Sequence, residues 1–170
     1  MSERTENMDE ILQPVANKGG KYLTFTLVGE EYGIDILKIK ELIGIMPVTT
    51  VPQTPDFVRG VINLRGKVIP VVDLRLKFGL ESADYTDRTC IIVVEVTKTD
   101  SIILVGMVVD SVSEVLNIDG ENIEGMPTIG DSVNIKYISG MAKIKDGVKI
   151  LIDIDKVLSN EELVEIVKAA

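Results

Sequence analysis

The stretch GVINLRGKVIPVVDLRLKFGL, which spans residues 60–80, carries the clearest structural signals in the chain. Two segments rich in Ile and Val, approximately 60–65 and 67–72, are separated by a glycine, a pattern typical of short β-strands joined by a turn. Pro70 lies inside the second segment and has no backbone N–H, so this segment is predicted to be an edge strand or a bulged strand. Residues 74–78 fit a short turn of helix.

Short strands are also predicted along the rest of the chain. In residues 22–28, Leu23, Phe25 and Leu27 recur at every second position, which indicates a half-buried strand, and residues 32–36 follow as its hairpin partner. Similar segments occupy residues 41–46, 90–97, 101–110, 113–118, 137–144 and 147–153. Many short strands at turn-limited spacing favour a mainly β fold, either a barrel or a sandwich.

Helix is predicted mainly at the C-terminus. Ser159 followed by Glu162 forms a capping-box pattern directly before an apolar series, because each side chain can bond the backbone N–H of the other residue. Residues 159–170 are therefore expected to form a helix that docks on the β structure.

An internal repeat relates the two halves of the chain. With an offset of 73, Gly33-Ile34 aligns with Gly106-Met107, and with an offset of 80, Gly60-Val61 aligns with Gly140-Met141. Apolar matches arise easily in a sequence rich in Ile and Val, so two unrelated β segments with similar patterning are the alternative. The two matches occur in the same order, which favours a true repeat.

The repeat predicts two similar small barrels, at residues 21–80 and 88–155. A module of this size is marginally stable alone, so the two barrels are expected to share an apolar interface. Residues 1–20 are polar and end in two glycines, which predicts a flexible N-terminal tail.

Composition limits the classes of partner. The chain has 170 residues and a formal net charge of −9, which disfavours binding to nucleic acid or directly to a membrane. The Lys and Arg residues are dispersed along the sequence. The longest apolar run, 102–109, is too short to span a membrane, and the single Cys90 suits a reducing cytoplasm.

The residue inventory disfavours catalysis. The chain has no His and one Cys, so it lacks the commonest general base and the commonest zinc ligand. Gly19-Gly20-Lys21 lacks the other residues of a phosphate-binding loop. We therefore expect no catalytic residue, no metal and no cofactor. The chemical alternative is a small carboxylate hydrolase, which would need two Asp or Glu side chains facing one pocket.

Residues 60–80 strongly resemble the signature of the CheW family, and the Asn-Leu-Arg-Gly block at 63–66 is its most specific part. Residues 32–36 and 54–60 match as well, and residues 105–115 look like the family's corresponding stretch in the second half. The resemblance covers nearly the whole chain. It implies two five-stranded SH3-like barrels packed together, with short helices and a C-terminal helix.

The resemblance implies an adaptor that couples chemoreceptors to the histidine kinase CheA in bacterial chemotaxis. Its implied partners are the regulatory domain of CheA and the cytoplasmic tip of a receptor, and its implied location is the cytoplasm, at receptor arrays on the inner membrane. CheA itself contains a similar domain, but this chain has no phosphotransfer His and no room for an ATP-binding or receiver domain. An adaptor of a different receptor–kinase pathway, such as one for surface motility, is the alternative.

The residues that the resemblance assigns to receptor binding are Ile36, Ile39, Glu41, Arg65, Cys90 and Val115. Strand alternation supports Arg65, because Ile62 and Leu64 would face the core and Arg65 would point outward. Arg65 equally fits a structural ion pair with Glu41, and the three aliphatic members fit an ordinary core. Cys90 stands where an aliphatic residue is expected, and a small thiol can fill the same space.

The residues that the resemblance assigns to kinase binding are Ile45, Pro47, Val48 and Ile129. Exposed apolar residues at a loop end are costly without a partner. Gly60 and Gly106 are more simply explained as backbone requirements than as contacts. A barrel that binds nucleic acid is a further alternative, which the negative charge disfavours.

Overall fold

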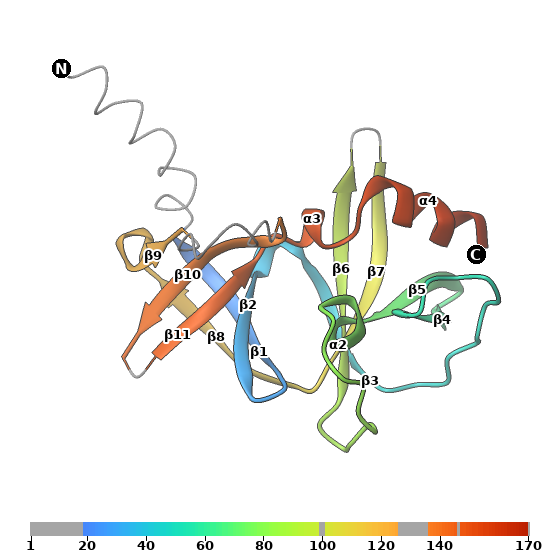
Figure 1. Cartoon of the computed structure of the whole chain (residues 1–170), viewed down its shortest axis with the longest axis horizontal. Helices are drawn as coiled ribbons and strands as arrows, with labels where there is room; N and C mark the ends of the chain where they lie inside the picture. Colours follow the sequence, from blue (N-terminus) through green and yellow to red (C-terminus); the bar gives the residue numbers. More distant parts are fainter. Residues whose placement is uncertain (1–18, 99–100, 126–135, 146, 170) are drawn as a thin grey trace.

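The computed structural model describes residues 19–98, 101–125, 136–145 and 147–169. Within these residues, eleven strands form two curled sheets that lie side by side, with few helices (Figure 1). The strands are β1 (Gly20–Leu27), β2 (Glu30–Asp35), β3 (Ile39–Gly44), β4 (Val58–Leu64), β5 (Lys67–Asp73), β6 (Cys90–Lys98), β7 (Ser101–Val109), β8 (Ser111–Ile118), β9 (Ile123–Glu124), β10 (Ile138–Ile144) and β11 (Gly147–Ile152). The helices are η1 (Ile36–Lys38), α2 (Leu74–Lys77), η2 (Gly120–Asn122), α3 (Ile154–Val157) and α4 (Asn160–Ala169). The predicted mainly β fold is confirmed.

The strand order shows that the two sheets differ from the predicted barrel boundaries. Sheet 1 has the order β8-β1-β2-β11-β10-β9, and sheet 2 has the order β3-β6-β7-β5-β4. Sheet 2 is therefore built from residues 39–109, whereas sheet 1 combines residues 20–35 with residues 111–152. The boundaries 21–80 and 88–155 do not coincide with either sheet, and the two-residue β9 gives sheet 1 a sixth strand.

The internal repeat explains this division. The parallel pair β5–β7 places Val71 opposite Gly106, and the parallel pair β11–β2 places Leu151 opposite Gly33. The offsets of 80 and 73 relate these two pairs residue by residue, so the same pairing occurs once in each sheet. Each pair joins strands from both halves of the chain, because the first hairpin of each half completes the sheet of the other half. Sequence offsets alone do not reveal such an exchange.

Pro70 does not lie on an edge strand, one of its two predicted placements, and the irregular register of the β4–β5 pair falls on β4, between Val58 and Gly60. Pro70 is buried in β5, which lies between β4 and β7. Pro70 pairs with Val61 of β4, whereas the ladder with β7 begins one residue later, at Val71. The proline is thus outside the ladder with β7, so an inner strand tolerates it.

Most of β6 and the second half of β7, residues 105–109, are buried on both faces, which accounts for their nearly continuous aliphatic sequence. In β6, Ile91 and Val93 face the interior of sheet 2, whereas Ile92, Val94 and Val96 face the core that the two sheets share. A third cluster fills the interior of sheet 1 and contains Tyr22, Ile118, Ile123, Ala142 and Leu151. The shared core is the apolar interface that the marginal size of each unit requires.

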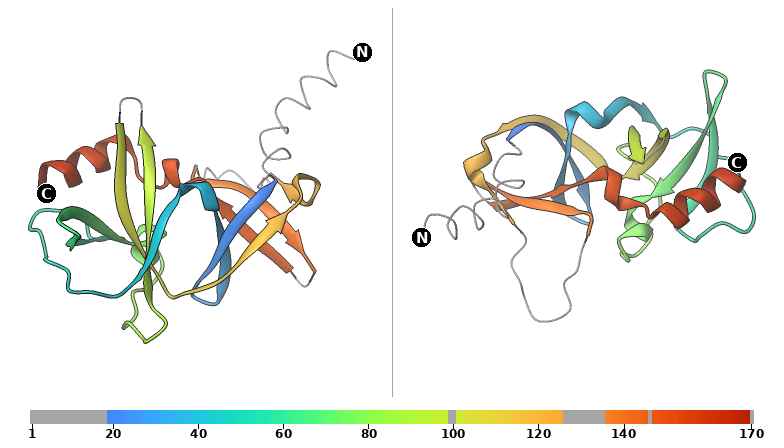
Figure 2. Two further views of the ribbon diagram at one scale, coloured as in Figure 1. Left: turned by 180° about the vertical axis from the view of Figure 1, so that it is seen from behind. Right: turned by 90° about the horizontal axis from the view of Figure 1, so that it is seen from above.

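The C-terminal helix begins with the predicted capping box. The Ser159 N–H donates to Glu162 Oε1 at 2.7 Å, and the Glu162 N–H donates to Ser159 Oγ at 3.1 Å. Leu163 and Ile166 are buried in the shared core, and Figure 2 shows α4 on the side of sheet 2. No helix within the described ranges combines the length and the apolar character that a membrane crossing requires.

Asp110 connects three parts of the fold. Its carboxylate accepts hydrogen bonds from Arg75 Nε at 2.7 Å, from Arg75 Nη2 at 2.5 Å and from the Val28 N–H at 2.9 Å. Burial raises the pKa of the Asp110 carboxyl, but the hydrogen bonds from Arg75 and Val28 outweigh burial and hold that pKa below its ordinary value. Residues from α2, the β1–β2 turn and the β7–β8 connection are therefore tied together.

Asp110→Ala is expected to lower the free energy of unfolding by about 1–3 kcal/mol near neutral pH, because it leaves a largely buried guanidinium without its partner. The stabilisation by Asp110 is present above the pKa of an unfolded Asp and is lost as the pH falls through the lower folded pKa. The difference between wild type and variant should therefore shrink in acid. Urea unfolding measures it.

Glu124→Ala is the matched control. It removes an ion pair with Lys143 whose side chains are 63% and 55% exposed, and pairs exposed to this extent contribute little. Equal unfolding midpoints for Asp110→Ala and Glu124→Ala would contradict the structural role of Asp110.

Candidate functional site

An ion pair joins the two outer strands of sheet 2. Arg65 Nη1 lies 2.6 Å from Glu41 Oε1, and Arg65 Nη2 lies 2.7 Å from Glu41 Oε2. Glu41 is on β3, and Arg65 directly follows β4, the strand at the other end of the sheet order. The bidentate geometry fixes the guanidinium in one orientation.

The turn between β4 and β5 positions Arg65. Arg65 has φ 52° and Gly66 has φ 87°, the two positive values that a tight two-residue hairpin turn requires. The Asn63 side chain accepts a hydrogen bond from the Gly66 N–H at 2.8 Å. Three residues of the 63–66 block thus build the turn that presents the arginine.

The ion pair is open to solvent on its cationic side. The Arg65 side chain is 72% exposed and the Glu41 side chain 25% exposed. The hydrogen bond between them lowers the pKa of Glu41 and raises the pKa of Arg65. Exposed pairs of this kind add little to stability, so Arg65 presents a fixed positive charge at the surface.

The apolar residues assigned to receptor binding fall into two groups. Ile36, Ile39 and Cys90 are half-buried and pack against the shared core, so the core interpretation holds for part of each side chain. Val115 lies on β8, one of the two outer strands of sheet 1, and is 50% exposed.

Burial raises the pKa of the Cys90 thiol, an effect that a backbone hydrogen bond with Val112 only partly offsets. An uncharged thiol suits packing better than redox chemistry.

Two exposed leucines close to Ile36 and Ile39 were not predicted from the sequence. Leu37 in η1 is 84% exposed, and Leu42 in β3 is 46% exposed. Alternation along residues 39–44 was the available signal for Leu42, because Glu41 and Ile43 share the opposite face. We use the name η1–β3 surface for Leu37, Leu42 and the Glu41–Arg65 pair, which flank β3, with Leu42 and Glu41 on opposite faces of the strand.

The structure separates the residues assigned to kinase binding. Ile45 and Pro47 are exposed in the loop after β3, whereas Val48 is half-buried and packs against the interior of sheet 2. Val48 is therefore at least partly structural. Ile129 lies outside the described residues.

Gly60 and Gly106 have backbone roles. A Cβ on Gly60 would lie 2.0 Å from the Thr49 carbonyl oxygen, and Gly60 has φ 141°. The same carbonyl accepts a hydrogen bond from the Val61 N–H at 2.9 Å, so it cannot move freely. A Cβ on Gly106 would lie 2.8 Å from Ile91 Cγ2. Both positions leave no space for a side chain.

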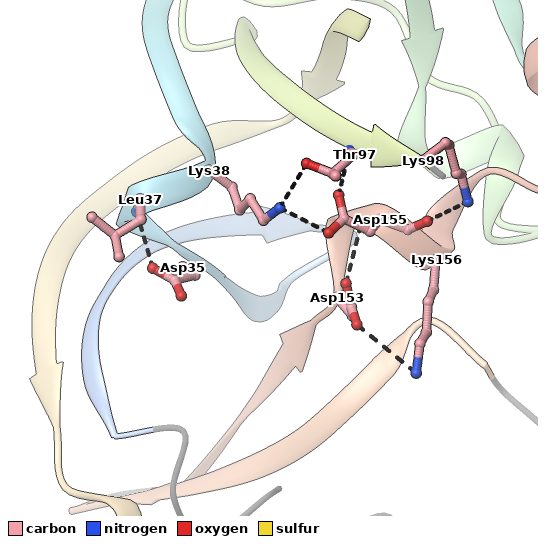
Figure 3. A network of polar contacts seen from close by, with 8 residues as sticks. All are labelled: Asp35, Leu37, Lys38, Thr97, Lys98, Asp153, Asp155 and Lys156. Carbon is pink, nitrogen blue, oxygen red and sulfur yellow. Dashed lines mark hydrogen bonds and ion pairs between the residues drawn. The ribbon is translucent and has the colours of Figure 1, made fainter. Parts of the chain in front are cut away.

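Three aspartates line one concavity, which bears on the hydrolase alternative (Figure 3). Asp35 accepts from the Leu37 N–H at 2.9 Å, and Asp153 accepts from the Asp155 N–H at 3.0 Å, so both cap short helices. The Asp155 carboxylate binds Lys38 Nζ at 2.8 Å and the Thr97 N–H at 2.7 Å.

These carboxylates are already used by structural partners, which favours capping and ion pairing over hydrolysis. Within the described residues, no group of three or more His, Cys, Asp or Glu is arranged to hold a metal ion.

Comparison with known proteins gives a consistent result. Residues 21–162 match the family model of the CheW-like domain. The chain is 42% identical over 145 residues to a chemotaxis protein CheW of Klebsiella aerogenes, with 85% of each chain covered. It is 32% identical over 155 residues to a chemotaxis protein CheW of Rhizobium meliloti, with 91% of this chain and 97% of the relative covered.

A solved structure agrees with these relatives. The crystal structure of the scaffolding protein TtCheW from Thermoanaerobacter tengcongensis matches with a TM-score of 0.75 and 34% identity. The match covers 85% of this chain and 95% of that chain.

Proposed function

The chain belongs to the family of CheW-like domains, and on that premise we propose that it holds its receptor and its kinase on two separate surfaces. The protein is a chemotaxis adaptor that couples chemoreceptors to CheA. The partner segments that we propose are the cytoplasmic tip of a receptor and the regulatory domain of CheA. The support for the proposal is that exposed apolar residues occur in two consecutive segments, Leu37 and Leu42 on η1 and β3, and Ile45 and Pro47 in the loop after β3.

The proposed receptor site is the η1–β3 surface together with Val115 on β8. A receptor tip is a helical hairpin, and such an element binds through an apolar stripe with a few polar anchors. The two exposed leucines and Val115 supply apolar contact area, and the oriented Arg65 supplies the anchor. Ile36, Ile39 and Cys90 are half-buried against the shared core, so their exposed parts are proposed to add to the contact.

The proposed kinase site is the loop after β3, with Ile45 and Pro47 as its exposed apolar contacts. Ile129, which lies outside the described residues, is proposed to belong to a separate contact made by the other barrel. We further propose that the protein has no catalytic activity of its own and acts at receptor arrays on the inner membrane. The support for the first statement is that members of this family are scaffolds.

Ile45→Asp is expected to weaken kinase binding roughly tenfold or more and to leave receptor binding unchanged, because a charge in an apolar contact is strongly unfavourable. Calorimetric titration with each partner measures both affinities. Val48→Asp is a poorer test, since Val48 packs inside sheet 2 and its replacement should destabilise the fold itself.

Val148→Asp provides the matched control for Ile45→Asp. Val148 is 51% exposed and lies on β11 of sheet 1, whereas the loop that contains Ile45 follows β3 of sheet 2. Loss of both partners by Ile45→Asp, with an unchanged circular dichroism spectrum, would show that the two surfaces are not separate.

A further inference from the structure

A cleft lined by lysines lies beside α3 and α4. It has a volume of about 770 Å³ and is bounded by α2, the end of β6, the residues before β10, α3 and the start of α4. Its four lysines are Lys77, Lys98, Lys136 and Lys156. They come from four separate parts of a chain whose formal net charge is −9, so the fold gathers cations that look dispersed in the sequence.

Two of the four lysines, Lys98 and Lys136, have no carboxylate partner among the described residues. Lys77 pairs with Glu162 at 2.8 Å. Lys98 Nζ donates instead to a backbone oxygen, that of Asp155, at 2.6 Å (Figure 3). Lys156 is 3.9 Å from an Asp153 oxygen, at the outer limit of an ion pair. Lys136 is exposed, and among the described residues no carboxylate pairs with it.

The floor of the cleft is apolar. The Tyr137 ring is stacked on Phe78 with 4.3 Å between ring centroids, and Val157 and Leu158 are buried beneath the lysines. Within the described residues no buried side-chain donor lacks a hydrogen-bond partner, so no buried donor is left for a small anion. A rim of flexible cations around an apolar floor fits a polypeptide that carries carboxylates next to apolar side chains.

The chain itself contains such a polypeptide segment. Residues 6–12 read Glu-Asn-Met-Asp-Glu-Ile-Leu, with three carboxylates and three large apolar side chains. The described chain begins at Gly19, which lines the same concavity as Asp155. The residue after Asp155 is Lys156, which lines the lysine cleft. The link from residue 12 to Gly19 can extend to about 25 Å, so the segment starts within reach of the cleft.

We propose that the acidic segment 6–12 docks in the lysine cleft of its own chain. Opposite charges attract the segment to the rim, and its apolar side chains cover the floor. A short tether gives an effective concentration in the millimolar range, so each contact can be weak. The inference concerns a surface separate from both proposed partner sites and does not depend on the adaptor function.

Zero-length crosslinking of the full chain tests the proposal. A carbodiimide joins carboxylates to lysines in direct contact, and mass spectrometry identifies the joined residues. Glu6, Asp9 and Glu10 are expected to couple to the cleft lysines roughly tenfold more than to Lys21, which is exposed and closer to the segment in sequence. A mixture of isotope-labelled and unlabelled protein separates links within one chain from links between copies.

A charge-reversal pair completes the test. Lys136→Glu should abolish most of the coupling to the remaining cleft lysines, whereas Lys145→Glu, the same charge change at an exposed residue of the β10–β11 turn, should leave it unchanged. High salt should also suppress the coupling by screening. Three results would overturn the proposal: equal coupling to Lys21 and the cleft, no effect of Lys136→Glu, or links found only between copies.

Discussion

Gly60→Ala is expected to destabilise the protein by about 2–5 kcal/mol, because the new Cβ would combine a severe steric clash with an unfavourable backbone conformation. The Cβ would lie 2.0 Å from the Thr49 oxygen, and that oxygen is held by the bond from the Val61 N–H. Relief therefore requires the loop after β3 to separate from β4. Urea unfolding, followed by circular dichroism, measures the loss.

Gly44→Ala is the matched control for Gly60→Ala. Nothing lies within 4 Å of a Cβ built on Gly44, and its φ is not in the positive range that disfavours side chains. Its stability should differ from wild type by no more than about 0.5 kcal/mol. If both alanine variants unfold at the same urea concentration, the backbone at Gly60 does not require glycine.

Gly60→Ala should also weaken kinase binding, because the loop that it displaces contains Ile45.

Arg65→Ala should weaken receptor binding roughly tenfold while leaving the melting temperature nearly unchanged. The Arg65 side chain is 72% exposed, so the ion pair with Glu41 contributes little to folding. The pair does fix the guanidinium at the surface, and truncation removes that anchor. Receptor affinity, kinase affinity and thermal unfolding are measured on one preparation.

Lys143→Ala controls for loss of a cation from an exposed ion pair. Its side chain is 55% exposed and pairs with Glu124 on sheet 1, away from the η1–β3 surface. It should change neither affinity. The binding function of Arg65 is wrong if Arg65→Ala melts several degrees lower and its folded fraction binds receptor normally.

Local features of the fold could be predicted from the sequence because they depend on neighbouring residues. Ile and Val enrichment with an intervening glycine identified the strands on both sides of Gly66, and the spacing of Ser159 and Glu162 identified the start of α4. Of the two placements predicted for Pro70, an edge strand or a bulged strand, the edge placement was wrong, because strand order is decided by pairing between distant segments. For the same reason the exchange of hairpins between the halves could not be seen, although the offsets that describe it were in the sequence.

The candidate site was only partly predictable. The ion pair between Glu41 and Arg65 was expected as an alternative to a binding role for Arg65. The structure contains the ion pair, and the Arg65 side chain is exposed enough to bind a partner while it remains paired. Apolar residue type alone could not separate Val48, which packs inward, from Ile45, which is exposed. The lysine cleft was hidden for a related reason, since its cations meet only after the chain has folded.

The central claim is that one copy of the protein holds receptor and kinase at the same time on separate surfaces. The most direct measurement is analytical ultracentrifugation of the protein mixed with a receptor cytoplasmic fragment and a CheA regulatory domain, each labelled with a different chromophore. If the two surfaces are separate, a single sedimenting species contains all three proteins, and the species formed by Ile45→Asp lacks only the kinase domain. Displacement of the kinase domain by added receptor fragment would contradict the account, because it would mean that the two partners share one surface.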